Sequence, residues 1–502
     1  MYTCPSLRWN LKYTSFADDA TFFLNDTKQS LQSLTRIIKE YSKVSGLKLN
    51  NSKSVILKIG ASKRSIDNFS DENEYTWTSE KASTLGITFT NDKNTTTAIN
   101  YDSKLKEFNT CLDNWKKYNL SLIGKITVIK TFALPKLIYP ITVLELPNNE
   151  MMKNIKLKMF DFLWDGKPDK IKRETLIQSY ENGGLKMIDI DIFIKTIKCS
   201  WIKRLSDQNN KGDWKAIYLR KLEKLGGIDF FECNINKEDS KHLIQKPTFL
   251  KEIVSSWADI NFSSNLKHIS TQKIWNNSLI KNNQNLFFNK EWQQKGIQTI
   301  GQLYDSKHKT FLTFEQMKIK FNLKQSDFLK YYQILSSIPK KWKSEIKHDT
   351  IENQQLNLYK SLMKSKASNK LISKIQLERI QSNNEIKPHK QWEKQFTNLN
   401  WKHIHSMPFE CTIDTKLRAF QYKYTMRIYP TNQFLFKCNM TNSSNCDFCH
   451  MDVETIRHLF WECRMVQSFW NEIKNMMINR NIDINLNFQT VSFGNSRKKK
   501  IK

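Results

Sequence analysis

Three cysteines and one histidine in the C-terminal part place the strongest constraint on how this chain can fold. The motif C-x2-C-x8-H-x4-C is formed by Cys446, Cys449, His458 and Cys463. Soft thiolates and an imidazole suit tetrahedral Zn²⁺, and four protein ligands leave no open position for a substrate. The spacing therefore predicts a small zinc knuckle in which the Zn²⁺ is structural.

The local geometry of the knuckle follows from the same spacing. The first two cysteines can share one tight turn, and the last two ligands are expected on or just after a helix whose Leu459 and Phe460 pack inward. His450 directly follows the second cysteine, and Cys438 lies eight residues before the first. Either could replace a ligand, and four unligated residues are a further alternative.

The other cysteines indicate a reducing compartment. The chain has nine cysteines, and those outside the knuckle region are scattered, so no disulfide framework is expected. The N-terminal stretch MYTCPSLRWNLK has no continuous apolar segment, and no later run approaches the roughly 20 apolar residues that cross a bilayer. We therefore expect an intracellular protein, in cytoplasm and nucleus, without a membrane partner.

An excess of basic residues makes nucleic acid the first partner to consider. The 80 Lys and Arg residues against 49 Asp and Glu residues give a formal net charge of +31. A surplus of this size attracts phosphate polyanions. The alternative is compositional drift, because Lys, Asn, Ile and Phe are all heavily used and Lys far outnumbers Arg, as in AT-rich coding sequences.

Two adjacent carboxylates lie near the start of the chain, in the segment YTSFADDATFFL. Extended residues rich in Thr and aromatics flank Asp18 and Asp19, so the segment predicts a β-hairpin with both carboxylates at or near its turn. Adjacent carboxylates repel each other unless solvent or cations neutralise them. Nucleotidyl transfer uses such a pair to hold two Mg²⁺ ions. The alternative is a solvated acidic turn.

The remaining patterns predict a short α+β part followed by a long series of helices. An amphipathic helix is expected up to Gly46, and short strands follow at SVILKI and STLGITFT. From Tyr101 on the apolar spacing is helical, with breaks expected at Pro135, Pro140 and Gly166. Because Gly and Pro are scarce, the chain is expected to be predominantly α-helical and, at 502 residues, to form several domains.

The N-terminal order of motifs resembles the palm of reverse transcriptases from non-LTR, LINE-type retrotransposons. The motifs are SFADDATFFL, the amphipathic helix, SGLKLNNSKS and STLGITF. A Tyr-Ala-Asp-Asp hairpin is typical of that family, and Phe16 takes the aromatic position here. The resemblance implies that Asp18 and Asp19 are catalytic and bind Mg²⁺, and that Lys53 approaches the phosphates of the incoming nucleotide. As an alternative, Lys53 is an ordinary surface lysine.

The resemblance continues along the chain. Trp115, LSLIGKITVIK, FLWDGK and GGLKMID are similar to the helical region after the palm, which includes the thumb that holds the primer–template duplex. It implies phosphate contacts for Lys125 and Lys130, with a solvated helix face as the alternative. GQLYDSKHKTFLTFEQMKIKF is similar to the family's linker region, and KLRAFQYKYTMRIYPTNQFLFK and ETIRHLFWEC are similar to its C-terminal zinc-binding region.

A basic and aromatic strip precedes the knuckle. Its basic residues are Arg418, Lys423 and Arg427. The aromatic residues between them are Phe420, Tyr422 and Tyr424. Phosphate contact and base stacking on such a strip would bind RNA or single-stranded DNA. Aromatic residues that face a core beneath a solvated basic face are the equal alternative.

The predicted fold is α+β and predominantly α-helical. It comprises a partial reverse-transcriptase palm of hairpin plus helix, a helical thumb, and a helical C-terminal region with the zinc knuckle. The predicted domains are a truncated palm (1–95), a thumb-like helical domain (96–205), a helical linker region (206–400), a zinc-binding reverse-transcriptase C-terminal domain (401–480) and a basic tail (481–502). The tail ends in NSRKKKIK, which could serve as a nuclear signal or a phosphate contact. The alternative is a solvated tail without a function.

The chain departs from the family before the hairpin. The family's palm carries a further catalytic Asp on an earlier strand, and its fingers bind the nucleotide, but only seventeen residues precede Asp18. The family's N-terminal endonuclease is missing as well. We therefore expect a fragment of a retrotransposon RNA-directed DNA polymerase, an enzyme of target-primed reverse transcription, that binds RNA template and DNA target or primer but does not polymerise alone. A non-catalytic zinc-containing nucleic-acid-binding relic and a protein-interaction module are the alternatives, and the oligomeric state is left open.

Overall fold

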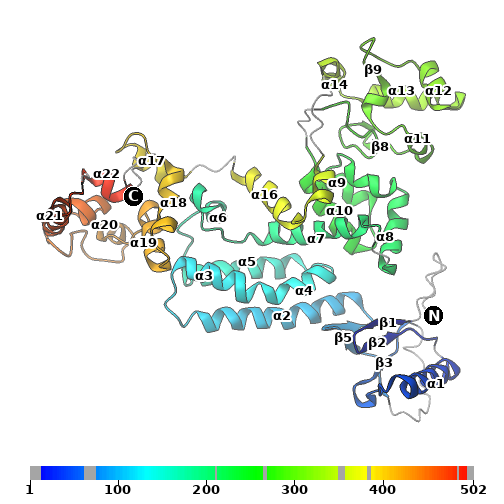
Figure 1. The fold of residues 1–502 in the computed structure, drawn as a ribbon, viewed down its shortest axis with the longest axis horizontal. Coiled ribbons are helices and arrows are strands. Elements are labelled where there is room, and N and C mark those ends of the chain that lie inside the picture. Colours follow the sequence, from blue (N-terminus) through cyan, green and yellow to red (C-terminus); the bar gives the residue numbers. More distant parts are fainter. Residues whose placement is uncertain are drawn as a thin grey trace. The chain divides into compact units, whose positions relative to one another are not determined.

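Helices joined by short connections make up most of the chain in the computed structural model, and the strands are few and short (Figure 1). The structure describes residues 13–25, 27–60, 75–209, 212–263, 268–348, 357–381, 386–482 and 485–494. The predicted α+β, predominantly α-helical fold is confirmed. The basic stretch NSRKKKIK lies outside the described residues.

Two compact units divide the chain. The first comprises Met1–Cys111 and Ala133–Ile155, and the second comprises Leu112–Phe132 and Lys156–Lys502. The five functional domains expected from the sequence stay a prediction.

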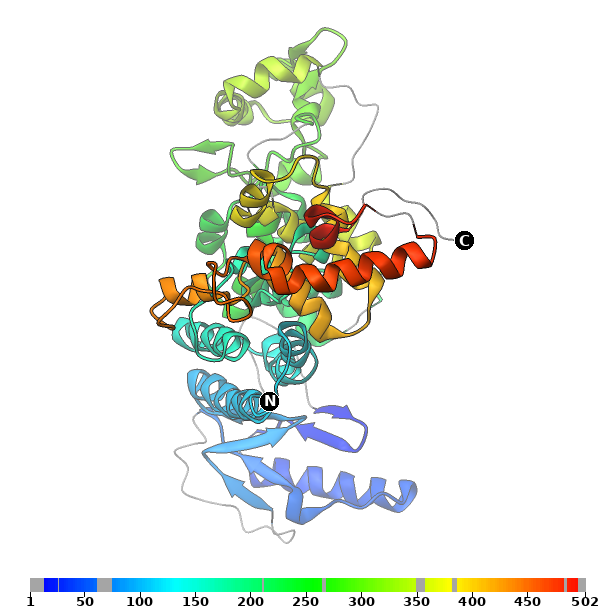
Figure 2. The ribbon, with the colours of Figure 1, turned by 90° about the vertical axis from the view of Figure 1, so that its left-hand side faces the viewer.

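The strands of the first unit pair two by two (Figure 2, blue). The pairs are β1 (Tyr13–Phe16) with β2 (Asp19–Phe22), β3 (Val55–Leu57) with β4 (Thr76–Thr78), and β5 (Lys81–Thr84) with β6 (Ile87–Thr90). The β3–β4 pair is parallel and the other two are antiparallel. Helix α1 (Lys28–Ser45) begins after Thr27, whose side chain accepts a hydrogen bond from the Ser30 N–H. It ends at Gly46, whose φ of 74° lies in the region that glycine tolerates, so the predicted helix end is confirmed.

Helices dominate the rest of the chain. Those before residue 270 are α2 (Lys93–Trp115), α3 (Leu122–Val128), α4 (Pro135–Val143), α5 (Asn149–Trp164), α6 (Arg173–Leu176), α7 (Ile190–Ser206), α8 (Asp213–Glu223), α9 (Lys237–Leu243) and α10 (Thr248–Asn261). Those after it are α11 (Lys290–Gln294), α12 (Phe314–Phe321), α13 (Phe328–Ser337), α14 (Lys340–Glu345), α15 (Leu358–Lys364), α16 (Ser368–Gln381), α17 (Lys387–Glu393), α18 (Trp401–Cys411), α19 (Thr415–Thr425), α20 (Asn432–Lys437), α21 (Arg464–Asn479) and α22 (Phe488–Phe493). Two small hairpins pair β7 (Lys281–Asn282) with β8 (Asn285–Leu286), and β9 (Tyr304–Asp305) with β10 (Thr310–Phe311).

One predicted helix break is wrong. Pro135 begins α4, and Gly166 follows α5 with a φ of 73°, as helix breaks do. Pro140, however, lies inside α4. A proline removes one helical hydrogen bond and crowds the preceding turn. Leu137, Pro140 and Ile141 are all buried, so the packing of this face offsets that loss.

The described part of the chain has no single helix that is long and apolar enough to span a bilayer. One bent pair, 122–133 with 135–143, meets that test together by length and composition.

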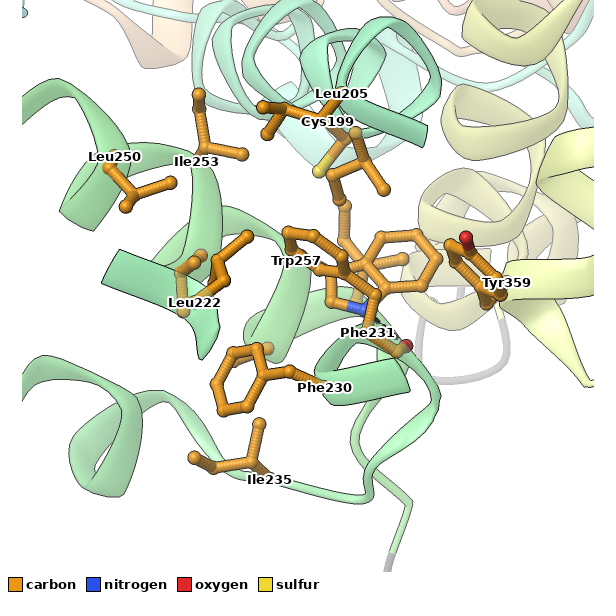
Figure 3. Packing of buried hydrophobic residues seen from close by; sticks show 14 of the residues in the cluster. Cys199, Leu205, Leu222, Phe230, Phe231, Ile235, Leu250, Ile253, Trp257 and Tyr359 are labelled. Carbon is orange, nitrogen blue, oxygen red and sulfur yellow. Dashed lines mark hydrogen bonds between the residues drawn. The ribbon is translucent and has the colours of Figure 1, made fainter. Parts of the chain in front are cut away.

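The second unit contains several separate hydrophobic cores. One surrounds Trp257, which is 1% exposed and whose indole N–H donates to the Phe231 carbonyl at 2.9 Å (Figure 3). This core joins α7, α10 and α16. A second core surrounds Trp292 and Tyr331, and a third surrounds Trp392 beside the cysteine cluster's own small core. Each of these three cores therefore contains at least one buried indole.

Candidate metal centre

The four side chains predicted to bind zinc meet at one buried point. Their ligand atoms all lie within 4.8 Å of one another, and all four side chains are buried. The Sγ atoms of Cys446 and Cys463 are 4.0 Å apart, and Cys449 Sγ is 3.3 Å from His458 Nε2. A tetrahedron with Zn–S bonds of about 2.3 Å places its corners about 3.8 Å apart. The cluster therefore has the size and the donors that Zn²⁺ needs.

A tight turn presents the first two cysteines. The Cys446 N–H donates to the Asp452 carbonyl, and the His450 N–H donates to the Cys446 carbonyl, both at 2.8 Å. His450 takes a φ of 59°, and Asn445 pairs with Val453 as a short antiparallel bridge. This left-handed residue closes the turn directly after Cys449, so that both thiols face the same side.

A wide helical turn presents the other two ligands. His458 begins the π-helical turn His458–Glu462, and its N–H donates to Thr455 Oγ1 at 2.9 Å. Cys463 follows directly and caps α21. Val466, one turn into α21, packs against the cysteines. The prediction of ligands on or just after a helix agrees with this placement.

Backbone dipoles and a carboxylate prepare the cluster for a cation. The N–H groups of Asp452 and Met451 point at Cys449 and lower the pKa of its thiol to about 6. Burial raises the pKa of Cys446, so that a cation is needed to hold both sulfurs as thiolates. His458 Nδ1 lies 3.9 Å from an Asp452 carboxylate oxygen, which leaves Nε2 to face the cluster.

A buried glutamate that the sequence reasoning missed braces the knuckle. Glu454 Oε1 accepts from the Asn432 N–H at 2.8 Å, and Oε2 accepts from the Asp447 N–H at 3.4 Å. The Asn432 side chain in turn donates to the Asn445 carbonyl and to Asp447 Oδ1. Position within the knuckle is the one signal that could have singled out Glu454, because its partner Asn432 lies outside the motif, at the start of α20.

The two alternative ligands lie outside the cluster. Cys438 and His450 are both exposed, and neither contributes to the group of four. Within the described ranges, this group is the one set of three or more Cys, His, Asp or Glu side chains placed to bind a metal.

The two N-terminal carboxylates lie on the predicted hairpin. Phe16 pairs with Asp19 across β1 and β2, so Ala17 and Asp18 form the turn. Ala17 takes a φ of 52°, which is unusual for a residue with a side chain. Asp18 and Asp19 are both exposed, and no third ligand-type side chain from the described residues joins them. Lys53 is exposed, in a turn where its N–H donates to Asn50 Oδ1 at 3.2 Å.

Of the two lysines Lys125 and Lys130, one is buried. Both sequence hypotheses for Lys125 assumed an exposed ammonium, but this residue is 6% exposed. Its Nζ pairs with Asp165 at 2.6 Å and donates to the Leu163 carbonyl at 3.4 Å. Its charge is therefore already neutralised. Lys130 is half-buried, and burial together with repulsion from Lys186 lowers its pKa.

The guanidinium groups of the basic strip contact nearby parts of the chain. The Arg418 guanidinium donates to the carbonyls of Thr412 and Phe409 at 2.6 and 3.1 Å. The Arg427 guanidinium lies 4.4 Å from the Trp392 ring centroid, and burial lowers its pKa. Tyr422 and Tyr424 are buried, so the core-facing alternative describes these two aromatics. Lys423 is partly exposed.

A group of lysines without counterions lies beside the zinc module. Lys167 and Lys170 follow α5, and Lys423 lies on α19. Burial, and then repulsion from Lys167 and Lys423, lower the pKa of Lys170. Within the described residues no ion pair neutralises these three lysines, nor Lys130 and Lys186. No sequence signal links positions so far apart.

The fold and the closed four-ligand site define the class as a helical protein with a zinc-binding module. Residues 387–470 match the family model described as zinc-binding in reverse transcriptase. The match includes all four ligands and the segment from α17 into α21. It relates this chain to reverse transcriptases, and it agrees with a structural Zn²⁺ held by Cys446, Cys449, His458 and Cys463.

Proposed function

We propose that this chain is the C-terminal portion of a LINE-type retrotransposon reverse transcriptase and binds nucleic acid through the lysines beside its zinc module. The cluster of Lys167, Lys170 and Lys423 without counterions carries the proposal. Uncompensated cations that repel one another are costly to hold together unless an anion binds them. A phosphate backbone supplies a row of such anions.

The cluster joins the two regions that the family resemblance implies for nucleic acid. Lys167 and Lys170 belong to the thumb-like segment, and Lys423 belongs to the zinc-binding domain. Lys130 and Lys186 add a second repelling pair from the thumb-like segment. In this proposal Lys423 and Lys130 keep their predicted phosphate contacts, whereas Lys125, Arg418 and Arg427 support the fold. RNA template and DNA target or primer are the partners, in cytoplasm and nucleus.

Replacing the cluster tests the proposal. We expect the triple variant Lys167→Gln, Lys170→Gln, Lys423→Gln to bind single-stranded RNA more weakly, with the slope of log K against log salt smaller by about 2, from three lost phosphate contacts. A matched triple exchange at the exposed residues Lys290, Lys307 and Lys309 removes the same charge elsewhere. Fluorescence anisotropy at several salt concentrations measures the RNA affinity and its salt dependence for both triple variants. An equal loss of RNA affinity in both variants would mean that only the net charge matters, and it would contradict the proposal.

We further propose that Asp18 and Asp19 are two positions of a partial Mg²⁺ site in an incomplete palm. Their adjacency on a hairpin turn beside the left-handed Ala17 supports this assignment. Polymerisation needs two Mg²⁺ ions held by more ligands than these two side chains, and no further ligand-type side chain of the described residues joins them, so we propose that the chain alone is inactive. Primer extension on poly(A) with Mg²⁺ tests this: incorporation that Asp18→Ala abolishes would show an active polymerase instead.

A protein-interaction module is the second candidate. Helix α21 exposes Met465, Phe469 and Met476 at helical spacing, and such a Met-rich stripe suits a protein partner. Wild-type protein that binds no RNA at low salt would favour this candidate over nucleic-acid binding.

A further inference from the structure

A tight turn that follows α6, the Gly183 turn (residues 179–187), packs against helices of the zinc-binding segment within the second compact unit. The Tyr180 ring stacks on Phe409 of α18, with ring centroids 3.7 Å apart. The hydroxyl of Tyr422, on α19, donates to the Gly183 carbonyl at 3.2 Å. These two bonded residues are 239 positions apart in the sequence, so the tertiary fold alone brings them together.

The tip of this turn is shaped for glycine. Gly183 is buried and takes a φ of 76°, a conformation that a residue with a side chain disfavours. A Cβ atom at this position would lie 2.9 Å from Ile386 Cδ1, 3.0 Å from His405 Nε2 and 3.2 Å from Met426 Cε. Three side chains from the start, the middle and the end of the α17–α19 region therefore enclose the glycine.

One wall of this enclosure is fixed by its own contacts. His405 Nε2 lies 2.8 Å from His389 Nε2, and the His389 ring stacks on Trp401 with centroids 3.8 Å apart and planes 7° apart. A close-packed imidazole with such neighbours gives way less easily than the flexible ends of Ile386 and Met426. A branched side chain at the tip of the turn would therefore displace the turn.

The Gly183 turn is connected to both parts of the lysine cluster. Lys167 and Lys170 precede it in the chain, and Lys423 directly follows Tyr422, which bonds to it. Repulsion from the other two lysines acts on Lys170, so the charges of the cluster push its two parts apart. Ring stacking and hydrogen bonding at the turn are uncharged contacts that oppose this repulsion.

We propose that Gly183 is a positioning residue, which seats the turn and thereby holds Lys423 beside Lys167 and Lys170 as one phosphate-binding surface. Gly183 acts through the lysines and does not itself contact nucleic acid. This inference rests on the proposed function, since the three lysines supply the phosphate contacts. The coupling is reciprocal, because a nucleic acid that bridges the lysines also stabilises the seated turn.

A double-mutant cycle on the full-length, zinc-loaded protein tests the positioning role. With single-stranded RNA, we expect Lys423→Gln in the wild-type background to lower the slope of log K against log salt by about 0.7. Gly183→Val should lower it by a similar amount, although it removes no charge. In the Gly183→Val background, Lys423→Gln should have a smaller effect, because Lys423 no longer shares a phosphate strand with the other two lysines. Fluorescence anisotropy at several salt concentrations measures the slope for all four proteins.

Gly296→Val is the matched control. Gly296 also has a positive φ, of 89°, but no atom lies within 4 Å of the position that a Cβ would take. In this background Lys423→Gln should lower the slope as much as in the wild type. Zinc content and circular dichroism show whether each variant keeps its fold. If Gly183→Val does not, the same cycle with Tyr422→Phe, which removes only the hydroxyl bonded to the turn, decides.

The outcomes separate the positioning role from the proposed function. An equal effect of Lys423→Gln in the wild-type and Gly183→Val backgrounds would show that the turn does not position Lys423, while the proposed function stands. If Lys423→Gln leaves the slope of the wild-type protein unchanged, the lysine cluster does not bind phosphate as proposed, and the proposed function fails together with this inference.

Discussion

At the scale of single residues, side chains of the same type have opposite roles in different environments. Cys449 is buried in the metal cluster, where backbone N–H groups favour its thiolate, whereas Cys438 is exposed and outside the cluster. Lys125 is neutralised inside the helices, whereas Lys423 lies among lysines that repel one another. The environment of each side chain, and not its type, decides which of them can bind a ligand.

The first prediction concerns the cysteines. We expect Cys449→Ser to lose the bound zinc, because a hydroxyl does not replace a thiolate ligand. Zinc content by atomic absorption, near one equivalent in wild-type protein, measures this. Cys438→Ser is the matched control and should retain the metal. If Cys449→Ser retains zinc and an intact fold, Cys449 is not a zinc ligand and the assigned zinc site is wrong.

A buried histidine pair gives the second prediction. His389 and His405 bring their Nε2 atoms to 2.8 Å, and His389 stacks on Trp401. Burial lowers the pKa of His389 to about 4 and that of His405 to about 3, with repulsion from His389 adding to the latter. The unfolded chain therefore binds more protons than the folded chain below pH 6.5. The contribution of this pair to the free energy of unfolding is therefore fully present above pH 6.5, and it is lost as the pH drops toward 4.

We expect the free energy of unfolding to fall by on the order of 3 kcal/mol between pH 6.5 and 4.5 through this pair. Urea unfolding across that range compares wild-type protein with His405→Gln, which should show a smaller slope against pH. Acid also releases zinc from both proteins, so the difference between them isolates the histidines. Identical slopes would contradict the assignment.

At the scale of elements, the knuckle depends on a helix that contributes no ligand. Helix α20 begins at Asn432, whose N–H is bonded to the carboxylate of Glu454 inside the knuckle. The Gln433 N–H also donates to the Glu454 carbonyl, at 3.3 Å. The helix start and the metal turn therefore share one buried acceptor, which couples their stabilities.

The third prediction tests this coupling. Glu454→Gln keeps the size of the side chain but removes its charge, and we expect a loss of about 1–3 kcal/mol because hydrogen bonds to a buried carboxylate are the stronger kind. Chemical unfolding of zinc-loaded protein measures it, and zinc should dissociate faster from the variant. Glu462→Gln, in an exposed pair with Arg457, is the control and should cost at most about 0.5 kcal/mol. Equal effects of the two exchanges would show that the brace is unimportant.

At the scale of the whole molecule, stability is distributed over separate cores. The core around Trp257 contains no part of the metal site, whereas the core around Trp392 includes Ile456, two residues before the ligand His458 (Figure 3 shows the former). Removal of the metal should therefore act on one part of the chain.

The fourth prediction follows from that distribution. On chelation of zinc, we expect amides in 387–482 to exchange hydrogen faster, while amides of α7 and α10 keep their protection. Hydrogen exchange followed by mass spectrometry on the full chain, with and without chelator, measures both regions at once. Simultaneous loss of protection in both regions would mean that the cores are a single cooperative unit.

The sequence by itself determined the features that depend on neighbours along the chain. Ligand spacing predicted the zinc cluster, and residue patterns predicted the hairpin of Asp18 and Asp19 and the helix that ends at Gly46. These three predictions are correct because turns, helix caps and short metal-binding loops are governed by local geometry. Local rules failed at Pro140, where burial of the helix face outweighs a lost hydrogen bond.

Only the tertiary structure decided which charges are free and which are paired. Lys125 and Asp165, Glu454 and Asn432, and the lysines beside α19 meet across long stretches of chain. Desolvation and Coulomb energies depend on distance in space, and a sequence read along one dimension does not contain that distance. The metal site could therefore be predicted residue by residue, whereas the surface that surrounds it could not.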